Sequence, residues 1–305
     1  MSTAVLCVDI GGTFTKAGVL HPQGQIDLIH SIPTTPDVDS YLHSLVSLIE
    51  RTRAAATQQE LEVKQLGVSV AGFLDPEREH LLYNPNLSWL EGFPLRKHLS
   101  GHFPGLALEL EIDSNAATMA EYRFGSGRGS KRFLCVTVGT GLGVGMTVEG
   151  SPLRFAYGCM GDAGHVIVWR DGPLCACGGR GCAEAIVSAP AIAGRYRQSA
   201  GIEHAMSLRD VIEAVEAGDP LAVSVLREAG EWLGIAIASL ANLFFPDHIA
   251  VAGGLSAAGD FTLRPAEESF RQSACVLARS NTTFTRATLG PTATLIGAAW
   301  PFWKE

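Results

Sequence analysis

One stretch decides how this sequence is interpreted: Gly161-Asp-Ala-Gly-His165-Val-Ile-Val-Trp-Arg-Asp-Gly-Pro-Leu-Cys175-Ala-Cys177-Gly-Gly-Arg-Gly-Cys182-Ala-Glu184. It holds one imidazole and three thiols between glycines, which allow the backbone to turn tightly around a point. One nitrogen and three sulfur ligands suit a closed tetrahedral zinc site, without an open position for a catalytic water. We therefore predict a structural zinc ion bound by His165, Cys175, Cys177 and Cys182.

The alternative is a group of buried thiols beside a core histidine. Three cysteines within eight residues, next to a histidine, favour the metal site over this alternative. The stretch also has almost no apolar content of its own, so that a metal would have to hold it together. Asp162 and Glu184 flank the cluster, and the metal would fix the positions of both carboxylates. We interpret the stretch as a zinc-clamped loop that binds a ligand.

The composition is that of a globular protein. At about 150 residues per domain, the 305 residues predict about two domains. Hydrophobic residues make up 47% of the chain and charged residues 18%, which argues against disorder. The 31 acidic and 23 basic residues give a net charge of −8. Because no run of Lys or Arg stands out, we expect no nucleic-acid partner.

The cysteines and the apolar segments indicate a cytoplasmic location. Seven cysteines at uneven spacing do not form a disulfide framework, and those outside the cluster are expected to be buried and reduced. The N-terminus does not resemble a signal peptide. The longest apolar run, from Ile235 to Phe245, is shorter than the ~20 residues that a membrane helix requires. We therefore expect no contact with a membrane.

Two similar glycine-rich turns stand more than a hundred residues apart. An apolar run from Ala4 to Val8 leads into Asp9-Ile-Gly-Gly-Thr13, and another from Phe133 to Val138 leads into Gly139-Thr140-Gly-Leu-Gly143. A second apolar run follows each turn, which predicts two strand–turn–strand units. Backbone N–H groups in such turns can hold phosphate oxygens, Asp9 could reach a hydrated Mg²⁺, and Lys16 could contact a phosphate. One such turn fits a plain hairpin equally well, but two predict a duplicated fold that grips one phosphate chain from both sides.

Asp113 stands where a predicted strand, residues 107–112, meets a predicted helix, residues 116–124. Ligands of open α/β sheets collect at such strand ends. Asp113 is a candidate general base, and an ordinary helix N-cap is the alternative. Periodicity predicts further strands at residues 25–33, 66–70 and 249–252, and helices at residues 36–56, 187–197 and 208–217, with a long helix after Asp219-Pro220. In the last helix, residues 294–300, nothing indicates chemistry.

Together these motifs resemble the ROK family (repressors, open reading frames and kinases), which shares the sugar-kinase, actin and Hsp70 ATPase fold. Asp9-Ile-Gly-Gly-Thr13 and Gly139-Thr140-Gly141-Leu-Gly143 resemble its two phosphate loops, and Val251-Ala-Gly253-Gly254 its nucleotide-side turn. Asp113-Ser-Asn115 resembles the end of its Asn-Asp-x-Asn motif. Gly161-Asp-Ala-Gly-His165 and the Cys175 to Glu184 segment resemble its Gly-Glu-x-Gly-His and zinc motifs.

The resemblance implies an α/β fold of two lobes with a ligand cleft between them. The N-terminal lobe would span residues 1–124, with a C-terminal helix at 293–305 packed back on it, and the C-terminal lobe residues 125–292. It implies an ATP- and Mg²⁺-dependent kinase for a hexose or N-acetylhexosamine, of the glucokinase or N-acetylmannosamine kinase type, acting at the C6 hydroxyl with Asp113 as the base. A homodimer is common among such relatives.

The resemblance also assigns binding residues. Those implied for the sugar are Gly72, Asn86, Asn115, Asp162, His165 and Glu184. Those implied for ATP and its phosphates are Asp9, Gly11, Gly12, Thr13, Lys16, Gly139, Thr140, Gly141, Gly143, Gly253 and Gly254. Two positions depart from the family pattern: Ile112 replaces the Asn that binds sugar hydroxyls, and Asp162 replaces a Glu. Both lie on the sugar side, so that phosphoryl transfer is the firmer prediction and the identity of the sugar stays open.

Two other functions remain as alternatives. One is a sugar sensor that binds without phosphorylating, although the first predicted strand begins too early for a preceding DNA-binding helix-turn-helix. The other is an ATPase of the chaperone or filament type, in which the zinc loop and Asp113 would have no purpose.

Overall fold

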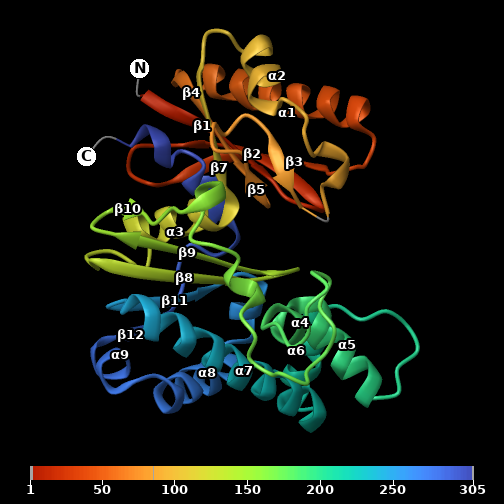
Figure 1. The fold of residues 1–305 in the computed structure, drawn as a ribbon. Coiled ribbons are helices and arrows are strands. Elements are labelled where there is room, and N and C mark those ends of the chain that lie inside the picture. Colours follow the sequence, from red (N-terminus) through yellow and green to blue (C-terminus); the bar gives the residue numbers. More distant parts are fainter. Residues whose placement is uncertain (1–2, 85, 304–305) are drawn as a thin grey trace. The chain divides into compact units, whose positions relative to one another are not determined.

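The structure is a computed structural model that describes residues 3–84 and 86–303 (Figure 1). Contacts between residues divide the chain into two compact units. Unit 1 consists of the chain up to Phe124, the segment Pro152–Gly161 and the chain from Thr292 onward. Unit 2 consists of Gly125–Ser151 and Asp162–Pro291. The segment Pro152–Gly161, which the sequence assigned to the C-terminal lobe, thus packs with unit 1.

A five-stranded sheet in the order β3-β2-β1-β4-β7 forms the centre of unit 1. Strands β1 and β2 form the antiparallel hairpin expected around the first glycine-rich turn, while β4 and β7 add in parallel. A short hairpin of β5 and β6 stands apart from this sheet. The strands of unit 1 are β1 (Thr3–Ile10), β2 (Phe14–Leu20), β3 (Ile26–Pro33), β4 (Glu62–Val70), β5 (Phe73–Leu74), β6 (Leu81–Tyr83) and β7 (Ala107–Ile112).

The second sheet repeats this plan in the order β10-β9-β8-β11-β12. Its central strand β8 pairs antiparallel with β9 across the second glycine-rich turn, and parallel with β11, which is in turn parallel to β12. The strands are β8 (Arg132–Val138), β9 (Leu142–Val148), β10 (Ser151–Pro152), β11 (His248–Ala252) and β12 (Thr283–Arg286). In both sheets, an antiparallel pair across a glycine-rich turn is continued by two parallel strands, which confirms the duplication that the two turns predicted.

Three longer helices and the short α10 pack within unit 1. Helix α1 lies over β2 and β3 (Figure 1) and buries the apolar face that its periodicity predicted, including Leu45 and Ile49. Helix α10 packs against α3 so closely that a Cβ on Gly297 would lie 1.7 Å from the carbonyl oxygen of Ala116. These helices are α1 (Val38–Gln58), α2 (Leu95–His102), α3 (Asp113–Phe124) and α10 (Ala293–Gly297).

The helices of unit 2 come after the zinc loop in the chain, and four of them, α4, α5, α6 and α8, contact α7. Asp219 caps α7 by accepting the N–H of Leu221 at 2.8 Å, as its position before Pro220 predicted. Helix α8, which the sequence analysis missed, packs along α7 and contains Pro265 in its interior. The helices are α4 (Glu184–Val187), α5 (Ala189–Ser199), α6 (Leu208–Glu216), α7 (Pro220–Phe244), α8 (Asp260–Ser273) and α9 (Val276–Asn281).

Candidate functional site

Three strands of unit 1 end in register at one edge of the sheet. Ile10 of β1 pairs with Val70 of β4, and Val70 pairs with Ile112 of β7. The residues that follow these strand ends are Gly11, Ala71 and Asp113. The register therefore brings the first glycine-rich turn and the candidate base to the same carboxyl edge, where open α/β sheets bind ligands.

Asp113 is the first residue of α3, and its Oδ1 accepts the N–H of Ser114 at 2.7 Å. Burial, and next the charge of Asp9, raise the pKa of Asp113 to about 7. A carboxylate with a pKa near neutrality is able to accept a proton from a hydroxyl group and release it again. An ordinary capping role does not require this environment, and the general-base interpretation is therefore favoured by the site itself.

Asp9 lies near the end of β1 and has one neighbour from β2 and another from α10. Lys16 is opposite Asp9 in the β1–β2 register, and Thr294 of α10 donates a hydrogen bond to Asp9 Oδ2 at 2.7 Å. Burial raises the pKa of Asp9, while the Thr294 hydroxyl and the Lys16 charge counteract the shift. Nothing in the sequence of residues 294–300 indicated chemistry, and the structure shows that α10 supplies a hydrogen-bond donor, Thr294, to the Asp9 carboxylate.

The loop after β6 meets the first glycine-rich turn. A Cβ on Gly12 would lie 2.8 Å from the Cβ of Asn86, so that Asn86 packs directly on the turn. Gly72, with a φ of +106°, faces the carbonyl oxygen of Tyr83, where a Cβ would lie only 2.4 Å away. Of the residues predicted on the sugar side, Gly72 thus packs against the end of β6, and Asn86, three residues further along the chain from Tyr83, packs on the first glycine-rich turn.

Asn115 is buried and its amide is used inside unit 1. Its Nδ2 donates to Glu111 Oε1 at 3.0 Å and to the carbonyl oxygen of Gly158 at 2.8 Å. Its Oδ1 is a buried acceptor for which the described residues supply no hydrogen-bond partner. A sugar contact from Asn115 would therefore have to use Oδ1.

The buried carboxylate of Glu111 connects this region to the segment Pro152–Gly161. Besides Asn115, it accepts the N–H of Ile112 at 3.0 Å and a hydrogen bond from Arg154, and Arg78 Nη1 lies 3.6 Å away. The side chain of Ile112 belongs to the apolar core and is 3% exposed. At the position where the resemblance implied a sugar-binding Asn, this chain therefore has a core side chain without a polar atom.

In unit 2, the second glycine-rich turn lies between β8 and β9. Its backbone closes with a hydrogen bond of 2.9 Å from the N–H of Gly139 to the carbonyl oxygen of Gly141, and Thr140 is exposed. Gly253, at the end of β11, packs against Val138, because a Cβ there would lie 2.3 Å from the Val138 carbonyl oxygen. The two predicted nucleotide turns of this unit, residues 139–143 and 253–254, thus share one sheet edge.

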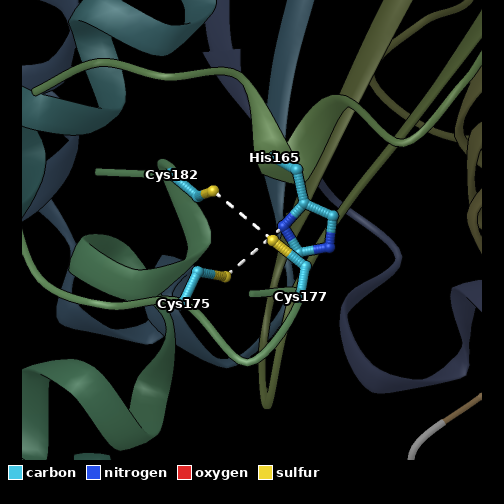
Figure 2. Close-up of side chains that lie close together, drawn as sticks. All are labelled: His165, Cys175, Cys177 and Cys182. Carbon is cyan, nitrogen blue, oxygen red and sulfur yellow. Dashed lines mark hydrogen bonds between the residues drawn. The ribbon is translucent and has the colours of Figure 1, made fainter. Parts of the chain in front are cut away.

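The four predicted zinc ligands come together at one point, as Figure 2 shows. Their ligand atoms all lie within 4.8 Å of one another. Cys177 Sγ is 3.7 Å from Cys182 Sγ, and Cys175 Sγ is 3.6 Å from His165 Nδ1. Zn–S bonds of about 2.3 Å in a regular tetrahedron would separate two sulfurs by about 3.8 Å and a sulfur from a nitrogen by about 3.6 Å. The donor set and its spacing fit a structural zinc ion.

The outer nitrogen of His165 faces a carboxylate. His165 Nε2 lies 3.3 Å from Asp162 Oδ2, which is the arrangement that fixes the tautomer and ring orientation of a metal-binding histidine. Burial raises the pKa of Asp162, the neighbouring His165 ring opposes the shift, and the negative charge of Glu184 adds to it. Asp162, His165 and Glu184 therefore influence one another within unit 2, as their positions around the zinc motif predicted.

Two residues of these regions, Thr294 and Arg154, had no signal in the sequence, and for a third, Glu184, the sequence did not indicate its hydrogen-bond partner. Thr294 reaches Asp9 only because α10 joins unit 1, and Arg154 reaches Glu111 only because the segment Pro152–Gly161 does so. Glu184 was expected on the sugar, yet its Oε2 accepts the N–H of Leu142 at 2.9 Å, inside the second glycine-rich turn. Each contact joins residues far apart in the sequence, and no local pattern reveals such pairs.

None of the helices within residues 3–84 and 86–303 is both long enough and apolar enough to cross a membrane.

Comparisons with known proteins, by sequence and by structure, all indicate the same family. The family model described as the ROK family matches residues 5–305. A glucokinase from Streptomyces coelicolor is 32% identical over 280 residues, which are 87% of this chain and 86% of that protein. The structure of a ROK glucokinase from Streptomyces griseus in complex with glucose and AMPPNP has a TM-score of 0.86 at 32% identity and covers 98% of both chains. A ROK hexokinase from Thermus thermophilus has a TM-score of 0.82 at 29% identity, over 97% of this chain and 96% of that one.

Proposed function

This chain belongs to the ROK family, and on that premise we propose that it is an ATP-dependent hexose kinase in which Asp113 is the general base. Its fold is that of the two-lobed actin-like ATPases, as its structural relatives have it. The observation that carries the assignment of Asp113 is its place at the carboxyl edge beside the first glycine-rich turn, with a pKa raised to about 7.

Phosphate binding is assigned to the glycine-rich turns. In unit 1, we assign phosphate to the turn of Gly11, Gly12 and Thr13, with Lys16 adding a positive charge; the N–H of Gly11 already donates to the carbonyl oxygen of Phe14 at 3.2 Å, which leaves the N–H groups of Gly12 and Thr13 for this role. In unit 2, we assign the nucleotide phosphates to Gly139–Gly143 and to the Gly253-Gly254 turn; within the first turn, the N–H groups of Gly139 and Leu142 are already used, by Gly141 and by Glu184. Asp9 would hold a hydrated Mg²⁺ ion, which when bound neutralises charge on the phosphate oxygens.

The chemical step needs little beyond positioning and one base. Asp113 accepts the proton of the attacking sugar hydroxyl, which we assign to C6. The hydroxyl oxygen then forms a bond to the γ-phosphorus as the bond from that phosphorus to the bridging oxygen breaks, and ADP leaves. Positioning and charge stabilisation supply most of the rate enhancement in such transfers, and the base supplies a smaller part.

The sugar is assigned to Gly72, Asn86 and Asn115 of unit 1 and to Asp162, His165 and Glu184 of unit 2. Zinc, held by the Cys₃His cluster, would supply no chemistry and would order the loop that bears the latter three. Since Ile112 is a core residue, it cannot make the sugar contact that the family's Asn makes. The loss of that one hydrogen bond weakens sugar binding by about 1 kcal/mol. The proposed substrate is therefore a class, a hexose or an N-acetylhexosamine, and not a single sugar.

Two further assignments complete the proposal. Reduced zinc-bound thiols and the use of ATP suit the cytoplasm. A homodimer without nucleic-acid partners is proposed from the resemblance and from the charge of −8.

The test is a coupled assay of ADP release with Mg-ATP against glucose, mannose, fructose, allose, N-acetylglucosamine and N-acetylmannosamine, with Asp113→Asn beside the wild type. A sugar-dependent signal that disappears in the variant is expected. ADP release that ignores added sugar would indicate an ATPase instead, and sugar binding without ADP release would indicate a sensor.

A further inference from the structure

The carboxylate of Glu184 is built into the second glycine-rich turn. Glu184 is two residues after the zinc ligand Cys182, and its Oε2 accepts the N–H of Leu142 at 2.9 Å. The same oxygen lies so near Gly141 that a Cβ on that glycine would be 2.5 Å from it. The approach is therefore possible only because position 141 has no side chain.

Two more contacts tie the turn to the residues around the zinc ligands. Gly164, next to His165, packs against Leu142, because a Cβ on Gly164 would lie 2.4 Å from the Leu142 carbonyl oxygen. The N–H of Ala189 donates to the carbonyl oxygen of Gly139 at 2.8 Å. The segments on both sides of the zinc cluster thus grip the turn, and all of these residues belong to unit 2.

The turn requires such external support. Gly139, Gly141 and Gly143 lose more conformational entropy on ordering than any other residue type would. Within the turn, the hydrogen bond from the Gly139 N–H to the Gly141 carbonyl oxygen offsets part of this entropy loss. The contacts from Glu184, Gly164 and Ala189 offset a further part. Of these, the Glu184 bond is the one with a charged acceptor, and such bonds are the stronger ones.

We propose that Glu184 is a positioning residue through which the zinc loop holds the second phosphate turn, so that zinc occupancy sets the affinity for the nucleotide. The inference rests on the proposed function in one respect, since it takes residues 139–143 to bind phosphate. Zinc then acts on the nucleotide through the backbone of Leu142, in addition to ordering the proposed sugar-binding residues.

The experiment measures binding of Mg-ADP by calorimetry in the absence of sugar, together with the zinc content of each protein. Glu184→Ala removes the acceptor, whereas Glu184→Gln keeps a carbonyl oxygen that can accept the same N–H. The control is Glu216→Ala, since Glu216 is an exposed carboxylate at the end of α6 in the same unit. Wild-type protein freed of zinc by a chelator forms the fourth sample.

We expect Glu184→Ala to retain its zinc and to bind Mg-ADP about tenfold more weakly, which corresponds to losing one hydrogen bond to a charged group. Glu184→Gln should stay within about threefold of the wild type, because a neutral acceptor gives a weaker bond. Glu216→Ala should be unchanged, and the chelated protein should be weakened as Glu184→Ala is. Unchanged Mg-ADP affinity in zinc-loaded Glu184→Ala would overturn the proposal.

Hydrogen exchange at the Leu142 amide provides a measurement that needs neither nucleotide nor variant. In the wild type, zinc removal should speed exchange at this amide while the amides of β1 in unit 1 stay protected. Unchanged exchange at Leu142 would also overturn the proposal. If wild-type protein binds no Mg-ADP at all, the proposed kinase function fails, and the exchange measurement still decides whether zinc orders the turn.

Discussion

Thr294 donates a hydrogen bond of 2.7 Å to Oδ2 of Asp9, although 285 positions separate the two residues in the chain. The bond holds one carboxylate oxygen of Asp9 in a fixed direction and counteracts the rise in pKa that burial causes. Thr294 therefore prepares Asp9 for the role that we assign to it.

Thr294→Val should raise the Mg²⁺ concentration needed for half-maximal activity about tenfold, since a hydrogen bond to a charged group is lost while the shape is kept. The value of kcat at saturating Mg²⁺ should change much less. Titration of activity with Mg²⁺, and of Mn²⁺ bound with ADP by electron paramagnetic resonance, measures the effect. Thr294→Ser, which restores the hydroxyl, should recover the wild-type requirement; a normal Mg²⁺ requirement in Thr294→Val would remove Thr294 from the site.

Asp113→Asn should lower kcat by about 10² or more, the usual range for loss of a general base, while sugar and Mg-ADP binding stay largely intact. In the wild type, kcat/KM should rise as the pH increases through about 7, because the carboxylate acts only when deprotonated. A pH–rate profile and calorimetric binding check both expectations. Turnover close to normal in the variant would make Asp113 a helix cap.

The same carboxylate makes stability depend on pH. The pKa of Asp113 is about 7 in the folded chain against an ordinary value of 3.8, so that between these values the folded state binds more protons than the unfolded state. Its stability therefore falls as the pH rises through this range, and the full penalty is present above pH 7. Asp113→Asn should be more stable than the wild type at pH 8, by up to about 4 kcal/mol, with a smaller difference at pH 5. Urea unfolding at the two pH values tests this, and an equal difference at both would contradict it.

Two exposed cysteines, one within the cluster and one outside it, provide a matched test of the predicted zinc site. Cys177 is a proposed ligand, while Cys275 is the N-cap residue of α9 outside the cluster. The expectation that cysteines outside the cluster are buried was wrong for Cys275, because it lies before a surface helix and not in a strand. Cys177→Ser should lose zinc and lower the melting temperature of the protein, whereas Cys275→Ser should change neither. Metal analysis and thermal unfolding measure the outcome. A fully stable Cys177→Ser protein, or a wild type without bound zinc, would remove the metal from the account.

Two glycines of the zinc loop allow the cost of a left-handed backbone to be measured separately from the cost of a steric clash. Gly181 and Gly178 both have positive φ, at +74° and +88°, but a Cβ on Gly181 would lie 1.6 Å from the Trp169 carbonyl oxygen, whereas nothing lies within 4 Å of one on Gly178. Gly178→Ala should therefore cost about 1–2 kcal/mol from its left-handed backbone alone. Gly181→Ala should cost more and weaken zinc binding. Equal losses of stability in the two variants would show that the clash is relieved elsewhere.

Local patterns predicted those parts of the fold that depend on local sequence. The hairpin of β1 and β2, the strand β7 and the cap of α7 at Asp219 follow from apolar runs, turn residues and capping, all of which act over a few positions. Helix α8 was missed because Pro265 lies within it, and a proline in that position normally ends a helix. Its packing along α7 outweighs this local preference.

The candidate site also contains some features that local sequence predicts and others that only tertiary structure creates. The zinc ligands lie within eighteen residues of one another, and spacing alone indicated their chemistry. The partners of Asp9, Glu111 and Leu142 come from α10, from Pro152–Gly161 and from α4, and only the folded chain brings them together. Residue types predicted the chemical groups, whereas their hydrogen-bond partners depend on tertiary structure.

The order in which a ribosome makes this chain gives the Asp9–Thr294 bond a further meaning. Strand β1 is among the first segments to be translated, and α10 follows only after every strand and α-helix of unit 2. Domains that are continuous in the chain tend to fold as they emerge, whereas contacts between distant segments must wait. A nascent chain that has not reached α10 can complete the sheet of unit 2 but leaves Asp9 without Thr294, so that the magnesium site that we propose at Asp9 would be completed only near the end of synthesis.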